Sequence, residues 1–135
     1  MSDQPTIIQM ADWNDEPEIW KLCEEMQAEQ PKHNLNWDRV GAVVRLATRR
    51  ERGILLVVRG EGSYIKAACL LVLDQVWYSD DWQLVEYFNF VRKNCRKSTY
   101  AKDLIAYAKG CADTLGVELI VFAARAWQRH APPIE

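Results

Sequence analysis

Apolar positions recur along the chain at two different spacings, and each spacing predicts a different kind of element. Between residues 101 and 115 the apolar side chains fall at i, i+3, i+4, i+7, i+11 and i+14, which places one stripe along a helix. Ser98 or Thr99 is placed to cap the start of this helix, and Gly116 is placed to end it. Residues 84–91 are rich in β-branched and aromatic side chains, and they predict a strand just before the helix.

Two further helices are predicted from the same helical spacing. The first begins near Asp15, where Glu18 stands at capping-box spacing, and it ends before Pro31. Asn36 is placed to cap the second, which runs to about residue 47. The apolar stripes consist of Ile19, Trp20, Cys23 and Met26 on the first helix and of Trp37, Val40, Val43, Val44 and Ala47 on the second.

Short apolar runs bounded by turn residues predict the other strands, at residues 6–10, 54–58, 64–74 and 117–123. Strands 54–58 and 64–74 flank a glycine-containing turn and form an antiparallel hairpin. Strand 117–123 follows strand 84–91 through a helix, and such a right-handed crossover makes the two strands parallel. The order β-α-α-β-β-β-α-β predicts an α+β fold, with a mixed, mostly antiparallel sheet and helices on both of its faces.

Length, composition and charge limit the class of protein. A chain of 135 residues with 49% hydrophobic and 27% charged residues is expected to form a single domain, residues 1–135. The formal net charge of −2 argues against a general binder of nucleic acid or of a membrane surface. We also find no signal peptide and no long apolar run, so we expect a cytoplasmic protein.

The cysteines indicate neither a metal site nor a redox pair. Cys23, Cys69, Cys95 and Cys111 show no C-x-x-C spacing and no neighbouring pair of histidines. We therefore expect four reduced thiols and no metal. Three of them should pack in the core, whereas Cys95 lies in a basic turn.

This basic turn is the strongest candidate for chemistry. Residues 92–97 hold four cations, Arg92, Lys93, Arg96 and Lys97, between a strand and the start of a helix. Free N–H groups at a helix N-terminus, the helix dipole and guanidinium donors together suit a phosphate or a diphosphate. A turn of this kind is equally often basic because it is exposed to water, and both readings stay open.

The residues after this strand resemble a known motif. The sequence Arg96-Lys97-Ser98-Thr99-Tyr100-Ala101 is similar to the acyl-CoA-binding motif of the GNAT N-acyltransferases, Arg/Gln-x-x-Gly-x-Gly/Ala. Arg96 and Ala101 match the motif, and Thr99 stands where the family usually has glycine, which allows a close approach of the backbone. The resemblance is to a compact, phage-type member of the superfamily, and the predicted order of elements extends it over nearly the whole chain.

The resemblance implies a set of site residues. Residues 96 to 101, namely Arg96, Lys97, Ser98, Thr99, Tyr100 and Ala101, would bind the diphosphate of acetyl-CoA, the acyl donor. The backbone of the central strand, around Phe90 and Val91, would bind the acyl carbonyl and the pantetheine arm. Glu86 in the same strand would accept the proton of an amine. Alternatively, Glu86 is a residue of the solvent side or a partner in a salt bridge.

The resemblance also implies a departure at the end of the chain. A full GNAT domain continues with a helix and a closing pair of strands, whereas only residues 124–135 follow here, so we expect a C-terminally shortened domain. Strand 117–123 would then have an exposed edge, which proteins tend to cover. We therefore expect a homodimer or another partner, with Trp127 near the contact.

The loop at residues 75–82 adds a candidate for acceptor binding. Trp77, Tyr78 and Trp82 stand beside Asp80 and Asp81, a combination that would suit a cationic acceptor. The same aromatic side chains would also serve to cover the sheet. In GNAT-like folds the connection at residues 30–36, which includes His33, often borders the acceptor site.

The leading hypothesis is an N-acyltransferase that moves an acyl group, expected to be acetyl, from acyl-CoA to a small-molecule or protein amine. The alternative is a GNAT-like module without catalytic activity that binds acyl-CoA or a protein partner. A nucleic-acid contact through the basic turn and the arginines at the end of the second helix is a third option, which the acidic net charge disfavours.

Overall fold

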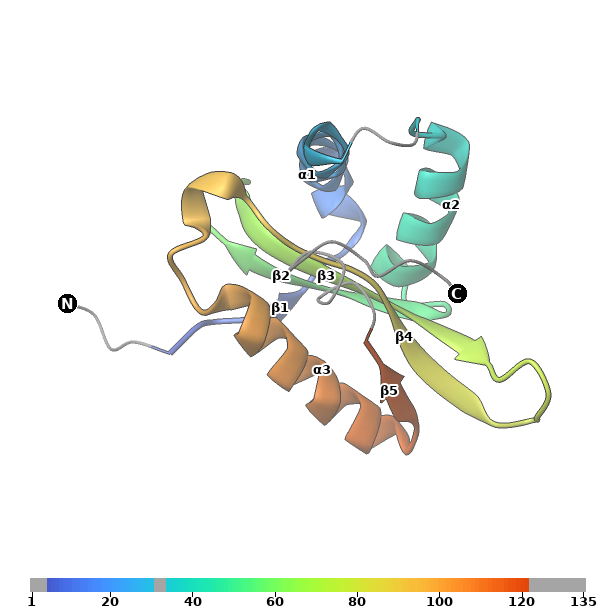
Figure 1. Ribbon diagram of the computed structural model, residues 1–135. Helices are drawn as coiled ribbons and strands as arrows, with labels where there is room; N and C mark the ends of the chain where they lie inside the picture. The colour runs from blue at the N-terminus through green and yellow to red at the C-terminus, as the bar shows by residue number, and fades with distance from the viewer. Residues whose placement is uncertain (1–4, 31–33, 122–135) are drawn as a thin grey trace, which may run out of the picture.

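The computed structural model describes residues 5–30 and 34–121, and these residues form one sheet with helices on both faces (Figure 1). The strands pair in the order β1-β2-β3-β4-β5, and only the pair of β4 and β5 is parallel. This arrangement confirms the predicted α+β fold. The elements are β1 (Gln9–Met10), the 3₁₀ helix η1 (Trp13–Asp15), α1 (Glu16–Glu29), α2 (Trp37–Thr48), β2 (Gly53–Arg59), β3 (Ile65–Gln75), β4 (Trp82–Val91), the 3₁₀ helix η2 (Lys93–Cys95), α3 (Tyr100–Leu115) and β5 (Glu118–Ile120).

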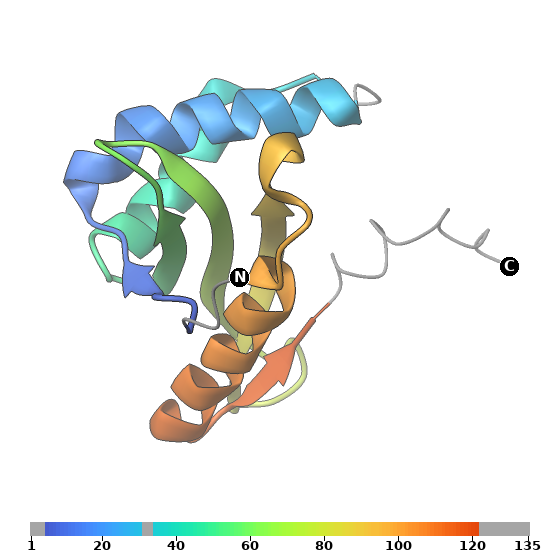
Figure 2. The same ribbon diagram turned by 90° about the vertical axis from the view of Figure 1, so that its left-hand side faces the viewer.

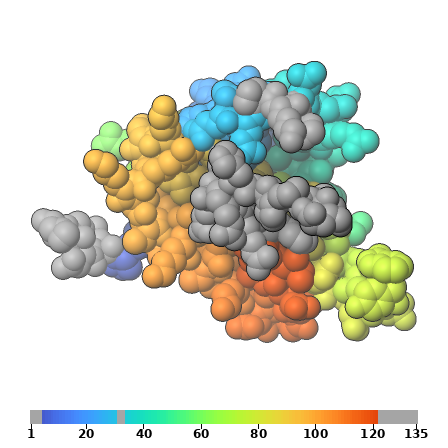
Figure 3. Space-filling view, viewed as in Figure 1, coloured from blue at the N-terminus to red at the C-terminus, as the bar shows by residue number. Residues whose placement is uncertain are grey.

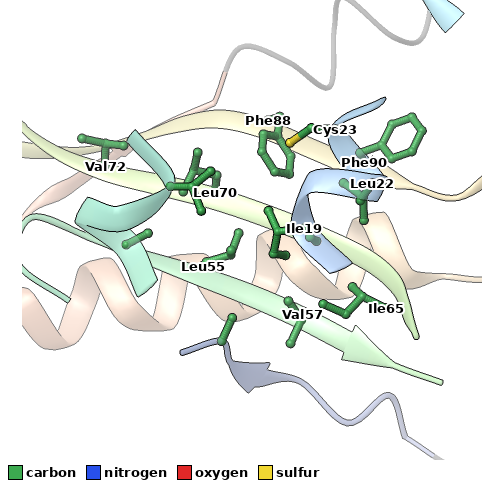
Figure 4. Close-up of a cluster of buried hydrophobic side chains, with 14 residues drawn as sticks. Ile19, Leu22, Cys23, Leu55, Val57, Ile65, Leu70, Val72, Phe88 and Phe90 are labelled. Carbon is green, nitrogen blue, oxygen red and sulfur yellow. The ribbon is translucent and has the colours of Figure 1, made fainter. Parts of the chain in front are cut away.

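The sheet separates two apolar cores. Helices α1 and α2 cover one face, where Ile19 and Leu22 of α1 pack against strand residues such as Leu55 (Figure 4). Helix α3 covers the other face with Leu104, Ala108 and Ala112 (Figure 2). Because both faces of β2 and β3 are covered, the apolar runs in these strands are continuous rather than alternating.

The structure differs from prediction at the starts of α1 and α2. The capping box belongs to η1, where Asp12 is the N-cap and Asp15 returns the hydrogen bond, so the prediction of a box from Asp15 to Glu18 was wrong. Asp15 instead binds Arg59 through both carboxylate oxygens, at 2.6 and 2.9 Å, and these bonds lower the pKa of Asp15. Trp37 is 38% exposed, although the helical spacing placed it on the buried stripe.

The predicted caps at Asn36 and Gly116 are confirmed, whereas Thr99, at the N-cap position of α3, makes no capping hydrogen bond with its side chain. Asn36 Oδ1 accepts a hydrogen bond from the Arg39 N–H at 3.2 Å, and α2 begins at the next residue. Gly116 ends α3 in the left-handed conformation, at φ 73°, which side chains rarely allow. Strand β5 is shorter than predicted, and residues 122–123 of that prediction, like Trp127 and His33, lie outside the described residues.

A bulge in β4 separates the strand into two halves. Leu70 pairs with Phe88 and Leu71 with Glu86, so Tyr87 has no opposite residue in β3. On its other side, β4 pairs with β5 only at residues 83–85. Within the described residues, the half of β4 after the bulge therefore has no strand along this edge.

Candidate functional site

The open edge of β4 presents backbone groups to an adjoining cavity. The Arg92 N–H donates to Lys66 O on β3 at 2.9 Å, so the alternate residues Asn89 and Val91 direct their backbone groups away from β3. Val91 O accepts a hydrogen bond from Arg96 Nε at 2.9 Å. The backbone N–H and C=O of Asn89 and the N–H of Val91 are therefore left for a ligand.

A cavity of about 290 Å³ lies between this edge and the start of α3. The Asn89 side chain joins its two sides, because Nδ2 donates to Ala101 O of α3 at 3.0 Å. The other amide atom, Oδ1, is buried and accepts no hydrogen bond from the described residues. A buried acceptor of this kind costs free energy unless a ligand or water donates to it. The cavity is lined by Asn89, Phe90, Val91, Arg96, Ser98 and Ala101.

Five of the eight residues predicted to bind the donor line this cavity: Phe90, Val91, Arg96, Ser98 and Ala101. The other three lie around it and do not line it. Lys97 is exposed, and the Thr99 hydroxyl donates to Asp103 Oδ2 at 2.7 Å. Tyr100 accepts a hydrogen bond from Lys66 Nζ at 3.3 Å.

The N-terminus of α3 has no side-chain cap. Thr99 occupies the N-cap position, but its hydroxyl is turned to Asp103, and Ser98 Oγ reaches only the Tyr100 N–H, at 3.4 Å. The N–H groups of Ala101 and Lys102 belong to the first turn, so they have no acceptor within the helix. Together with the positive end of the helix dipole, these donors suit an anion.

Threonine in place of the family's glycine does not strain this turn. Thr99 has φ −98° and ψ 16°, a conformation open to any L-residue. Its side chain makes the hydrogen bond to Asp103 and does not line the cavity. The departure from the motif is therefore compatible with the backbone that an anion would contact.

Arg96 lies at the cavity wall and is already partly engaged. Its Nη2 donates to both carboxylate oxygens of Glu29, at 2.7 and 2.8 Å, and its guanidinium lies 5.2 Å from the centre of the Phe90 ring. Nη1 has no hydrogen-bond partner within the part of the chain that the structure describes. The guanidinium is thus fixed in place with one nitrogen left for a ligand.

Arg92 has a structural role, which corrects the expectation that its guanidinium joins the anion site. Its side chain is 8% exposed and faces α1, where Nη1 donates to Glu25 at 3.0 Å and Nη2 lies 3.7 Å from Glu18. Its Nε donates to Ile65 O at 2.7 Å. The sequence could not distinguish Arg92 from Arg96, because the glutamates that bind them lie in α1, far away along the chain.

Glu86 lies directly before the bulge and is 2% exposed, which excludes the solvent-side alternative. It pairs with Leu71 and shares with Leu84 the face of the sheet that α3 covers. Burial raises the pKa of the neighbouring Cys69 thiol well above its ordinary value, and the charge of Glu86 adds to this effect. Its role as proton acceptor stays a prediction.

A second, larger groove of about 490 Å³ lies on the opposite face, between α1, α2 and β4. Tyr87 and Phe88, at the bulge, line it from β4. Gln30, Asn34 and Leu35 line it as well, from the connection that the resemblance placed beside the acceptor. The remaining lining residues are Cys23, Met26, Gln27, Arg39, Val40, Val43, Val44 and Leu70.

The aromatic loop after β3 does not cover the sheet. Trp77 is 91% exposed at the tip of the β3–β4 hairpin, which stands out from the body of the molecule (Figure 3). The ring of Trp77 contacts that of Tyr78 edge to face, and Trp82 lies 5.6 Å from the Arg52 guanidinium. Within the described residues, the cation that lies over an aromatic ring here is therefore Arg52 of the chain itself.

Other expectations can be compared with the described residues. All four cysteines are free thiols; Cys23 and Cys69 are buried, and Cys111 is partly buried against the core under α3. No cluster of three metal-ligating side chains occurs in residues 5–30 and 34–121. None of the helices in these ranges is long and apolar enough to cross a bilayer.

Comparison with solved structures identifies the fold. No family model matches the chain, and no curated protein matches its sequence. An aminoglycoside acetyltransferase from a soil metagenomic sample, solved with sisomicin, aligns at a TM-score of 0.67 and 17% identity, over 96% of this chain and 91% of that one. A possible acetyltransferase from Clostridium difficile aligns at 0.71 and 16%, over 96% and 93%. A GNAT family acetyltransferase from Staphylococcus aureus aligns at 0.65 and 13%, over 96% and 94%.

The chain therefore shares the fold of these acetyltransferases, which is the fold that its resemblance to the GNAT proteins implied. At these identities the likeness is one of fold. The compact, phage-type subgroup stays a prediction.

The two arginines of the basic turn should differ in their effect on stability. Replacing Arg92 by methionine leaves Glu18 and Glu25 without their buried cation, so we expect a loss of about 3–5 kcal/mol. The Arg96 side chain is 41% exposed, so Arg96→Met should cost less than about 1 kcal/mol. Urea unfolding of both variants measures the difference, and equal losses would contradict the structural role of Arg92.

Proposed function

We propose that this chain transfers an acyl group from acyl-CoA, with acetyl-CoA as the expected donor, to the nitrogen of an amine. The observation that carries the proposal is the opening beside β4, where pairing with β5 is limited to residues 83–85 and a cavity leads to the uncapped start of α3. The GNAT fold, found in acetyltransferases, supports the same reading.

The residues of the cavity fit the parts of an acyl-CoA molecule. The N–H groups of Ala101 and Lys102 and the remaining Arg96 nitrogen are donors for a diphosphate. The Asn89 and Val91 backbone groups suit the amides of a pantetheine arm, and Asn89 Oδ1 is a buried acceptor for an N–H. Lys97, Thr99 and Tyr100 would surround the diphosphate without lining the cavity.

The transfer needs the amine nitrogen to attack the thioester carbonyl. A C–N bond forms, the C–S bond breaks and CoA leaves as a thiolate, while the nitrogen loses a proton. Backbone N–H groups of β4 near the bulge would stabilise the charge that develops on the carbonyl oxygen. We assign the proton to Glu86, the carboxylate that directly precedes the bulge. Its burial on the α3 face requires a water molecule to carry the proton.

The alternative, a module that binds acyl-CoA or a protein partner without turnover, is favoured by one specific observation. Glu86 is 2% exposed, lines neither the donor cavity nor the groove on the other face, and therefore has no direct path to an amine there. The two proposals share the donor site and differ only in whether thiol is released.

We retain the homodimer as part of the proposal. Within the described residues β5 pairs only with β4, so its other edge is available to a second copy of the chain or to another partner.

Adding a negative charge at the cavity should weaken donor binding. Ser98→Glu places a carboxylate where the diphosphate would lie, so the affinity for acetyl-CoA should fall about tenfold, which equals about 1.4 kcal/mol. A glutamate before a helix stabilises that helix, so unfolding would not explain the loss. Isothermal titration calorimetry measures the affinity.

The matched control is Ala106→Glu, at an exposed position of α3 that does not line the cavity. It should leave the affinity for acetyl-CoA unchanged within about twofold, the scale of a weak surface charge effect. Equal losses in both variants, or no loss in Ser98→Glu, would contradict the proposed donor site.

Glu86→Gln should separate binding from turnover. The substitution keeps the size of the side chain but removes the base, so thiol release with a panel of amines should fall about a hundredfold. The rise in melting temperature caused by acetyl-CoA should persist, because Glu86 does not line the donor cavity. Unchanged thiol release would exclude Glu86 as the base, and a thermal shift without release in the wild type would favour the non-catalytic module.

A further inference from the structure

The groove between α1, α2 and β4 has the composition of a site for an apolar group. Its walls come from three elements, including Met26 of α1, Val40 and Val43 of α2, and Phe88 of β4. Figure 4 shows Phe88 beside Cys23, and both residues line the groove. Water in such a groove has few hydrogen-bond partners. An apolar side chain of matching size would bind there because it displaces this water.

The groove carries no negative charge along its described lining. No carboxylate is among its lining residues. Burial, reinforced by the charge of Glu24, raises the pKa of the Cys23 thiol to about 11, so it is neutral at pH 7. Burial and the nearby Asp74 also raise the pKa of Tyr87, which stays a neutral phenol.

The carboxylates of α1 nearest the end of the groove are turned elsewhere. Glu25 binds Arg92 and Glu29 binds Arg96, both in the basic turn after β4. Glu24, whose charge acts on Cys23, is exposed and does not line the groove. The described lining therefore offers no carboxylate to an ammonium group. A polycation would therefore lose its water without gaining an ion pair.

Arg39 is the one Lys, Arg, Asp or Glu among the described residues that line the groove. Its side chain is exposed at the groove and has no ion pair with any described residue. A guanidinium in this position favours a carboxylate on the bound molecule, because the two groups can share two parallel hydrogen bonds.

The groove also meets the donor site along one strand. Tyr87 and Phe88 line the groove, and residues 89–91 line the donor cavity. At about 3.3 Å per residue, a donor laid along this edge needs only a few residues of strand to bring its acyl end to the bulge. An apolar surrounding also disfavours the ammonium form, so it favours the neutral amine that the transfer requires.

We infer that the acceptor is an apolar amine that carries one acid group, with its apolar part in the groove and its acid group on Arg39. The inference rests on the proposed function and names the substrate class of that reaction. It excludes polycationic acceptors of the aminoglycoside kind.

The test compares amines that differ only in the acid group. Phenylalanine with phenethylamine, and leucine with isoamylamine, form two such pairs, and sisomicin serves as the polycation. With acetyl-CoA and wild-type protein, thiol release should show a higher kcat/KM for each amino acid than for its partner amine, and no release with sisomicin. Arg39→Gln should lower kcat/KM for the amino acids about three- to tenfold, mainly through KM, and leave the simple amines unchanged.

Arg49→Gln is the matched control, because Arg49 is an exposed arginine next to α2 that does not line the groove. It should change neither class of acceptor. Equal effects of Arg39→Gln on amino acids and amines, or faster release with sisomicin, would overturn the inference while the acyltransferase proposal stands.

A binding measurement covers the case without turnover. Phenylalanine, added to protein saturated with acetyl-CoA, should shift the NMR resonances of the Tyr87 and Phe88 rings, and sisomicin should not. Absence of these shifts overturns the inference. Absence of both a thermal shift with acetyl-CoA and thiol release with any amine would instead overturn the proposed function.

Discussion

The bulge at Tyr87 determines which part of the β4 edge is open. Before it, β4 is hydrogen-bonded on both edges, to β3 and to β5. After it, the backbone groups of Asn89 and Val91 face a cavity instead of a strand. Because unpaired backbone groups are costly in a dry environment, such an edge needs water or a ligand, and a chain of amides is a suitable ligand. The same bulge places Tyr87 and Phe88 on the opposite face, where they line the groove between α1, α2 and β4.

A double ion pair holds the basic turn against α1. Glu25 and Glu29 are one helical turn apart, and they meet Arg92 and Arg96, which are also four residues apart. Arg92 is buried and fixes the end of β4, whereas Arg96 is partly exposed and keeps one nitrogen at the cavity. Glu29 thus positions the guanidinium, and its negative charge would also oppose a bound diphosphate.

The spacing of apolar residues predicted the helices and strands well, because helices pack on both faces of the sheet and each must bury an apolar stripe. The stripe of α3 and the αL conformation of Gly116 follow from local residue preferences. Trp37 was placed wrongly because helical spacing shows which residues share a face, but not where that face leaves the core. The capping box was placed wrongly because Asp12 opens a 3₁₀ turn, and Arg59, from a distant strand, takes the Asp15 carboxylate.

The site was predicted in part, and the missing part depends on tertiary contacts. The motif located the cavity through Arg96, Ser98 and Ala101. The bulge has no sequence signal without a partner strand to count against, so the open edge and the orphaned oxygen of Asn89 were missed. The composition of the groove could not be read either, because its walls come from three separate segments.

A crystal structure of the chain with acetyl-CoA tests the proposed donor site. We predict the diphosphate within hydrogen-bonding distance of the Ala101 and Lys102 N–H groups, and the pantetheine arm along Asn89 and Val91 with its thioester at the bulge. A donor bound elsewhere on the molecule, with β4 still open along this edge, would contradict it.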